Sequence, residues 1–167
     1  NNLVFSAPFD EEDFSPASGG GSLNVGDPIT GLKLFREQLV IFTERSIFIL
    51  VGNSIADFQL QPVTRDLGCV EPDTIQEIGG DVLFLAPDGL RLLSATERNN
   101  DFGLATVSRV IQQDFLVVLS VSTSFCSVVL REKGQYRIFG YTSTFQNTQG
   151  PGIIATQKSA QGGSQVE

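Results

Sequence analysis

The chain has 167 residues, of which 41% are hydrophobic and 18% charged, and its formal net charge is −8 at pH 7. This length suits one domain with a core of its own. The acidic balance and the scattered Lys and Arg residues argue against specific nucleic-acid binding, and the apolar runs are far shorter than the roughly 20 residues that cross a bilayer, so no membrane insertion is expected.

Residues 1–28 are rich in Gly, Ser, Pro, Asn and Asp, and they are predicted to form a flexible acidic N-terminal arm. The acidic residues at 10–13 are expected to be a solvated patch. Three aromatic residues, Phe5, Phe9 and Phe14, are spaced through this polar segment. Aromatic side chains in such a segment indicate docking, either onto a neighbouring subunit or onto the chain's own sheets. They are the candidate interface residues.

Residues 29–147 are predicted to form one domain of β-strands, because short runs of Val, Ile, Leu and Phe alternate with turn residues. Three hairpins of similar rhythm follow one another: "VIFTERSIFIL" at 40–50, "VLFLAPDGLRLL" at 82–93 and "VVLREKGQYRIF" at 128–139. In the second, "PDG" at 87–89 predicts a turn in which Gly supplies the positive φ. Further strands are expected at 29–35, 58–64, 74–79, 104–110 and 115–121. A helical turn competes with a strand only at 55–60 and 107–115.

The hairpins recur about every 42–46 residues with three or four strands per repeat, which is typical of β-propeller blades. We therefore predict an all-β fold of about three four-stranded antiparallel, propeller-like blades. Propellers close with roughly 4–8 blades, so the chain is expected to be a fragment of a larger propeller. Blades that pair with another chain, or a β-sandwich with three unrelated hairpins, are the alternatives. Residues 148–167 form a Gly/Gln/Ser-rich C-terminal segment.

The sequence offers few residues for catalysis. Histidine is absent, which removes Ser-His-Asp and Cys-His arrangements and the commonest metal ligand. The acidic cluster at 10–13 lacks the spacing of a calcium loop. The arginines lie mostly beside predicted turns, where solvated side chains are expected. We predict no catalytic residues, no cofactor and no metal, with a hydrolase as the least favoured interpretation.

The two cysteines, Cys69 and Cys126, lack the spacing of a metal or redox motif. They are predicted to be free thiols, with Cys126 as a small core side chain. A disulfide between them stays open.

Four stretches carry a resemblance to a known family: "FREQLVIFTERSIF", "TRDLGCVEPDTI", "IGGDVLFLAPDGL" and "LREKGQYRIFGY". Over residues 24–140 the chain resembles virion structural proteins of tailed bacteriophages, particularly marine cyanophages. It is similar in pattern to their propeller-bearing tail nozzle and hub proteins. The resemblance implies a non-enzymatic component of the phage tail or its connector, made in the host cytoplasm, whose partners are copies of itself or other virion proteins.

The alternative function is a propeller binding module that recognises a host-surface glycan or protein. Its recognition residues would lie in loops at the blade ends, at 64–73 or 96–103. Saturable binding to host envelope fractions is the observation that would favour it.

Overall fold

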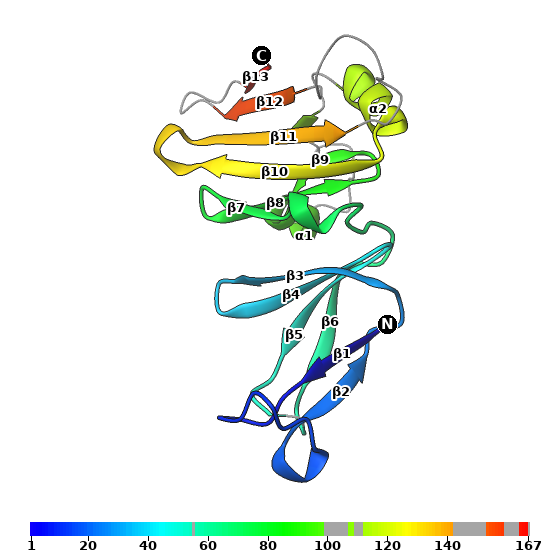
Figure 1. Ribbon diagram of the computed structural model, residues 1–167, viewed down its shortest axis with the longest axis vertical. Helices are drawn as coiled ribbons and strands as arrows, with labels where there is room; N and C mark the ends of the chain where they lie inside the picture. Colours follow the sequence, from blue (N-terminus) through cyan, green and yellow to red (C-terminus); the bar gives the residue numbers. More distant parts are fainter. Residues whose placement is uncertain (55, 99–106, 109–111, 142–152, 159–163, 167) are drawn as a thin grey trace. The chain divides into compact units, whose positions relative to one another are not determined.

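Two compact units make up the chain, Asn1–Cys69 and Val70–Glu167 (Figure 1). This computed structural model describes all residues except 55, 99–106, 109–111, 142–152, 159–163 and 167. Antiparallel sheets dominate both units, which confirms the predicted β class. The division falls after Cys69, whereas the sequence analysis placed boundaries at 28 and 147. Among the described residues no sheet closes on itself.

Unit 1 contains a four-stranded and a two-stranded sheet. The larger sheet is an up-and-down meander of β3 (Ile29–Phe35), β4 (Gln38–Thr43), β5 (Ile47–Val51) and β6 (Gln59–Thr64). It confirms the predicted strands at 29–35 and 58–64 and the hairpin between them. The smaller sheet pairs β1 (Asn2–Phe5) with β2 (Gly21–Asn24), and the 3-10 helix η1 (Pro16–Ser18) lies between these strands.

The core of unit 1 joins these two sheets. Leu3, Val25 and Ile41 are buried together, and side chains from both sheets pack around them. Those partly buried neighbours are Leu23, Ile29, Leu39, Phe48, Leu50 and Leu60. Residues 1–28, for which the sequence predicts a flexible arm, therefore supply two strands and core side chains. Alternate apolar residues are enough to bury one face of a strand even where the overall composition is polar.

The β4–β5 turn of unit 1 explains why a glycine precedes Cys69, because the chain passes close to the backbone of this turn at residue 68. The buried Thr43 hydroxyl donates to the Ser46 carbonyl oxygen and accepts from the Ser46 amide, both at 2.8 Å. The Cys69 amide donates to the Thr43 carbonyl oxygen at 2.9 Å. At Gly68 a Cβ would lie 2.2 Å from that same oxygen, so only glycine allows the chain to pass this close.

Unit 2 contains a three-stranded and a four-stranded antiparallel sheet, both in meander order. The first consists of β7 (Gln76–Ile78), β8 (Asp81–Ala86) and β9 (Gly89–Leu92). The second consists of β10 (Ser124–Leu130), β11 (Gln135–Tyr141), β12 (Ile153–Lys158) and β13 (Ser164–Val166). The short helices of this unit are η2 (Pro72–Thr74), α1 (Leu93–Arg98), α2 (Gln112–Val121) and η4 (Arg131–Lys133). The second and third predicted hairpins are thus confirmed, as β8–β9 and β10–β11.

One predicted strand of unit 2 is wrong. The segment at 115–121, "FLVVLSV", lies in helix α2. A continuous apolar run has no period of its own, so sequence alone does not separate a buried strand from a buried helix. Of the predicted strand at 104–110, only residues 107 and 108 are described, and they are not in a strand. The segment at 148–167 holds β12 and β13.

The two sheets of unit 2 share one core with α2. Buried side chains come from β8, β9, α2, β10 and β11: Leu83, Leu85, Leu90, Phe115, Phe125, Tyr136 and Ile138. Hydrogen bonds tie the four-stranded sheet to η2, which precedes β7. The Tyr136 hydroxyl donates to the Thr74 carbonyl oxygen at 2.9 Å, and the Ser127 hydroxyl donates to that of Asp73 at 2.9 Å.

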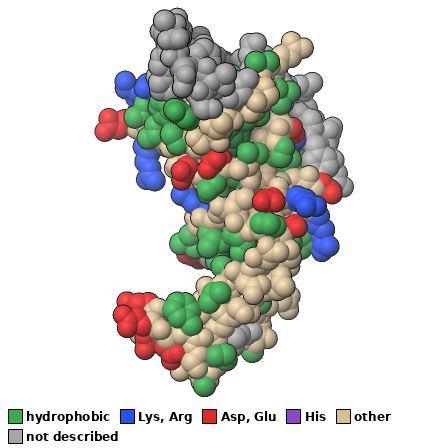
Figure 2. Space-filling model, turned by 45° about the vertical axis from the view of Figure 1, so that its right-hand side comes forward, with side chains coloured by type: hydrophobic (Ala, Val, Ile, Leu, Met, Phe, Trp, Pro, Cys, Tyr) green, Lys and Arg blue, Asp and Glu red, His purple; other side chains and the backbone are tan. Residues whose placement is uncertain are grey.

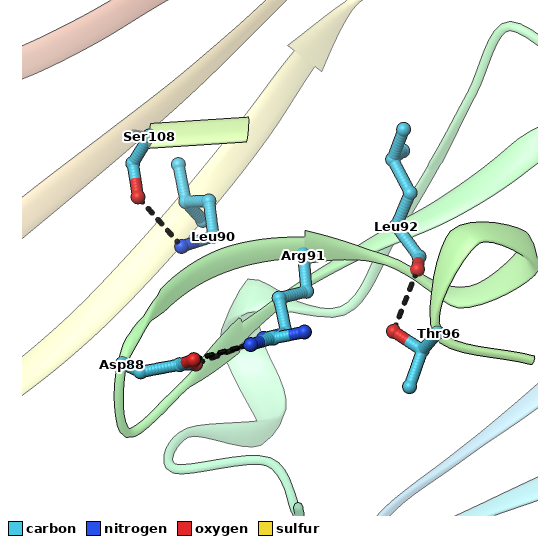
Figure 3. Close-up of polar contacts among 6 residues, drawn as sticks. All are labelled: Asp88, Leu90, Arg91, Leu92, Thr96 and Ser108. Atoms are coloured by element: carbon cyan, nitrogen blue, oxygen red, sulfur yellow. Dashed lines mark hydrogen bonds and ion pairs between the residues drawn. The ribbon is translucent and has the colours of Figure 1, made fainter. Parts of the chain in front are cut away.

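The β8–β9 turn is held by a charged pair (Figure 3). Arg91 is only 1% exposed, and its guanidinium donates to both carboxylate oxygens of Asp88. Across the strand, the Leu90 amide donates to the Ser108 hydroxyl oxygen at 3.2 Å. The solvated state expected for the arginines is therefore wrong for Arg91, because it lies in β9 directly opposite Phe84 of β8, which is itself fully buried.

Candidate assembly surfaces

The first candidate surface is the connection between β1 and β2, residues 6–20, which we call the Phe9 loop. Backbone and side-chain hydrogen bonds hold it in one conformation. The Ala7 amide donates to the Asp13 carbonyl oxygen at 2.6 Å, and the Ser15 amide donates to Asp13 Oδ1 at 2.7 Å. At its end, the Gly20 amide donates to the Ser15 carbonyl oxygen at 2.9 Å. A Cβ on Gly20 would lie 2.6 Å from the Phe14 backbone, so the loop closes tightly there.

Phe9 occupies a strained position at the tip of this loop. The turn Ala7-Pro8-Phe9-Asp10 closes with a hydrogen bond from the Asp10 amide to the Ala7 carbonyl oxygen at 3.3 Å. Its third residue has φ = 68°, a conformation that favours glycine. Among the described residues the other non-glycine residues with positive φ are Arg36 and Glu37. They form a two-residue hairpin turn, which commonly requires that geometry.

The three candidate aromatic residues have different surroundings. Phe5 lies in β1, is half-buried, and packs edge-on against Phe58 with ring centroids 5.3 Å apart. Phe14 is 52% exposed, and Phe9 is fully exposed at 107%. An aromatic ring entirely in water, held by an ordered turn, forgoes about 1.5–3 kcal/mol of burial free energy. Phe9, and to a lesser degree Phe14, are thus available for contact, whereas Phe5 already has a partner in unit 1.

The Phe9 loop is strongly acidic. Asp10, Glu11 and Glu12 are exposed, and Asp13 follows them. The pKa of Asp13 lies below its usual value, first because the Ser18 hydroxyl donates to its carboxylate and second because the Ser15 amide does so. Figure 2 shows acidic side chains gathered beside hydrophobic ones at one end of unit 1. The tip therefore combines negative charge with an exposed aromatic ring.

The second candidate surface lies at the β10–β11 hairpin, where a depression of about 630 Å³ opens on the surface. We call it the hairpin groove, and its lining residues are Val129, Leu130, Arg131, Glu132, Lys133 and Arg137. The register pairs Leu130 with Gln135 and Val128 with Arg137, so the hairpin brings Arg137 back towards the basic residues of η4, Arg131 and Lys133. Three basic side chains surround one acidic side chain here, in a chain that is otherwise acidic.

Arg137 is fixed within this groove. Its Nη2 donates to Gln135 Oε1 at 3.0 Å. Its Nε is buried and has no hydrogen-bond partner within the described part of the chain. Val128, beside it on the same face, is 43% exposed. The groove thus offers an oriented guanidinium next to apolar surface, which is the combination that binds carboxylates and aromatic rings.

The hairpin groove is not among the surfaces predicted from the sequence, because the basic residues look scattered along the chain. The signal was present in "REKGQYR" at 131–137, which holds three basic residues within seven. The meaning of that spacing depends on the hairpin, which folds residue 137 back beside residue 128. The sequence pattern alone does not show this.

Cys69 and Cys126 do not form a disulfide in the structure. Cys69 is buried and Cys126 is exposed, so the predicted core position of Cys126 is wrong. In β10 the side chains alternate, and Phe125 takes the buried side while Cys126 faces out with Val128.

The remaining candidate sites from the sequence are two recognition loops and a metal site. Of the proposed recognition loop at 64–73, Leu67, Gly68 and Cys69 are buried, and residues 99–103 of the other loop lie outside the described residues. The described residues hold no group of three or more His, Cys, Asp or Glu side chains placed to bind a metal. No helix in that part of the chain has the length and apolar character to span a membrane.

Comparisons with known proteins add no relative. No family model matches the chain, and no curated protein matches it.

Proposed function

We propose that this chain is a structural component of a bacteriophage virion, with its antiparallel sheets serving as propeller blades and the Phe9 loop attaching it to copies of itself or to a neighbouring virion protein. The observation that carries the proposal is Phe9. A fully exposed aromatic residue at φ = 68° lowers the free energy of unfolding for two reasons, because its backbone is strained and because its ring gains nothing from burial. Strain kept in an ordered loop points to a role outside the fold itself.

The arrangement of the strands supports the blade part of the proposal. Each of the three repeated hairpins lies in its own sheet, and each sheet has neighbouring strands in chain order. Meanders of this kind are the building unit of propellers. The resemblance over residues 24–140 supplies the phage assignment, and three of the four stretches that carry it overlap β4–β5, β8–β9 and β10–β11.

The action would be mechanical. Sheets with shared cores, such as that around Phe115 and Tyr136, form rigid walls, and exposed loops hold the neighbours. The net charge of −8 suits a wall beside a passing genome, because like charges keep DNA from adhering.

The experiment is light scattering after gel filtration over a wide range of dilution, with wild type and Phe9→Ser. The monomer mass is 18.0 kDa, and we expect wild type at a defined multiple of it, with ring- or fibre-like particles in negative stain. Phe9→Ser should shift the mass towards the monomer. Val117→Ser is the matched control, because Val117 is also an exposed apolar residue, at 62%, but lies on α2.

A wild-type chain that stays monomeric at every concentration would overturn the proposal. If that monomer also binds bacterial envelope fractions saturably, the chain would be assigned to host recognition instead.

A further inference from the structure

We propose that the Phe9 loop of one copy docks into the hairpin groove of a second copy, so that the chain assembles head to tail. This inference rests on the proposed function and names the two surfaces that would carry it. The two surfaces belong to separate parts of the chain, since the loop lies in unit 1 and the groove in unit 2.

Charge complementarity is the first argument for a second copy as the occupant. The loop carries Asp10, Glu11, Glu12 and Asp13 without a basic residue between them. The groove carries Arg131, Lys133 and Arg137 around Glu132. In a chain with 19 acidic and 11 basic residues, a locally basic depression is the exception, and the most acidic segment is its natural counterpart.

The apolar parts of the two surfaces also match. Phe9 presents a whole aromatic ring, and the groove is lined by Val129 and Leu130 as well as by basic residues with aliphatic stems. A volume of about 630 Å³ holds a ring and its neighbours, since small-molecule sites span roughly 300–1,000 Å³. A guanidinium over the ring adds a cation–π contact. Unit 1 already contains one such contact, with Arg36 Cζ 4.8 Å from the centre of the Phe35 ring.

The hairpin groove also presents donors suited to carboxylates. The guanidinium of Arg137 is oriented by the Gln135 side chain, whose Oε1 accepts a hydrogen bond from Nη2. Arg131 and Lys133 are exposed at the rim. Carboxylates of the incoming loop would thus meet one fixed and two adjustable cations, which gives both orientation and tolerance.

The geometry of this contact decides the kind of assembly. Loop and groove are different surfaces, so each copy would use one of each and the contact would be heterologous. Such contacts produce a ring when the rotation closes and a filament when it does not. A closed ring leaves no loop or groove unoccupied, whereas an open filament leaves one loop free at one end and one groove free at the other.

The test changes the charges of the two surfaces. Glu11→Lys/Glu12→Lys removes the net charge of the loop, because the two lysines then balance Asp10 and Asp13, and Arg131→Glu/Lys133→Glu makes loop and groove both acidic. Each variant alone should weaken self-association at least tenfold, as measured by light scattering over a dilution series. An equimolar mixture of the two should form pairs, because the acidic loop of the groove variant then meets the basic groove of the loop variant. The quadruple variant should stay dissociated, because its loop has no net charge and its groove is acidic.

Two controls separate this contact from general effects of charge and folding. Glu37→Lys/Glu44→Lys changes the net charge by the same amount as the loop variant but at exposed turns of unit 1, so it should assemble like wild type. Circular dichroism melts show which variants keep the fold. Raised salt should weaken wild-type assembly, because the Debye length shrinks from about 10 Å at 0.1 M to about 3 Å at 1 M.

A zero-length carbodiimide cross-link identifies the partners directly. It couples carboxylates to amines, so Lys133 should join Glu11 or Glu12. With a mixture of ¹⁴N and ¹⁵N copies, peptides carrying both isotopes show that the link is between chains. A link within one chain would overturn the inference, as would wild-type assembly that none of the variants alters. That second result leaves the proposed structural role standing, whereas a monomeric wild type removes both.

Discussion

Two turns of this chain begin with the same dipeptide and have opposite environments. In unit 1, Ala7-Pro8-Phe9-Asp10 projects an aromatic ring into water at a positive φ. In unit 2, Ala86-Pro87-Asp88-Gly89 places a buried glycine at φ = 134° in the position that needs it. The Asp88 carboxylate then binds a buried guanidinium (Figure 3).

The comparison separates a turn that stabilises its unit from one that serves something outside it. The β8–β9 turn uses proline, glycine and a charged pair, each in the place where it favours the hairpin. The Phe9 turn uses proline in the same way but puts phenylalanine where glycine would relieve strain. Substitutions in the two turns should therefore have effects of opposite sign on stability.

The largest effect is expected for Arg91→Ala. It removes a 1%-exposed side chain and leaves a cavity beside Asp88, which should lower the free energy of unfolding of unit 2 by about 3 kcal/mol. Urea unfolding followed by tyrosine fluorescence measures this, because both tyrosines, Tyr136 and Tyr141, lie in unit 2 and the chain has no Trp. Arg131→Ala, at an exposed position, is the control and should change it by less than about 0.5 kcal/mol. A loss below about 1 kcal/mol for Arg91→Ala would show that the turn does not depend on the charged pair.

Gly89→Ala should cost unit 2 about 1–3 kcal/mol, because φ = 134° lies in a region that is nearly exclusive to glycine. The matched variant is Gly134→Ala in the β10–β11 turn. There φ is 60°, in the left-handed helical region, and nothing lies within 4 Å of the added Cβ. It should cost about 1 kcal/mol. Equal losses in the same urea titration would contradict the difference drawn between the two positions.

Phe9→Gly should stabilise unit 1 by about 0.5 kcal/mol. Relief of left-handed strain, about 1–2 kcal/mol, outweighs the added chain entropy of glycine, and the exposed ring gives up no burial. Amide hydrogen exchange in β1 and β2 measures this, since unit 1 has no tyrosine. Phe5→Ala is the contrast, with a loss of about 1–2 kcal/mol from its packing on Phe58. Destabilisation by Phe9→Gly would mean that the ring supports the loop.

The smallest effect concerns pH at the Phe9 loop. The folded pKa of Asp13 is lowered by hydrogen bonds from Ser18 and Ser15, so this carboxylate contributes stability above its unfolded pKa of about 3.9. That contribution is lost as the pH falls from there through the lower folded pKa. A carbon-detected titration of the carboxyl groups should show Asp13 titrating below the ordinary range, with the protection factor of the Ser15 amide against hydrogen exchange falling at the acidic end.

Asp13→Asn should abolish this pH dependence of the Ser15 amide. Asp57→Asn should leave it unchanged, although the pKa of Asp57 is also lowered, chiefly by the Ser54 hydroxyl, because Asp57 closes a different loop. An Asp13 that titrates at its ordinary value would remove the electrostatic account of this loop.

Local patterns in the sequence were sufficient for the strands and their turns. Strands β3–β6 and the hairpins β8–β9 and β10–β11 follow from alternating or continuous apolar runs between turn residues, and "PDG" marks its turn because proline and glycine restrict φ by themselves. The β class follows from the same information. These features depend on residues close together in the chain.

Only the tertiary structure decided which of these residues are buried and which meet. Phe5 and Phe9 look alike in the sequence, but Phe5 has Phe58 against it and Phe9 has water. Cys126 and Arg91 exchanged their expected environments, one exposed and one buried, because strand alternation and neighbouring elements set each side. The run "FLVVLSV" lies in a helix, and the basic residues of "REKGQYR" line one groove because the β10–β11 hairpin brings them together. Burial is a property of all the segments that surround a residue, so no pattern local to that residue contains it.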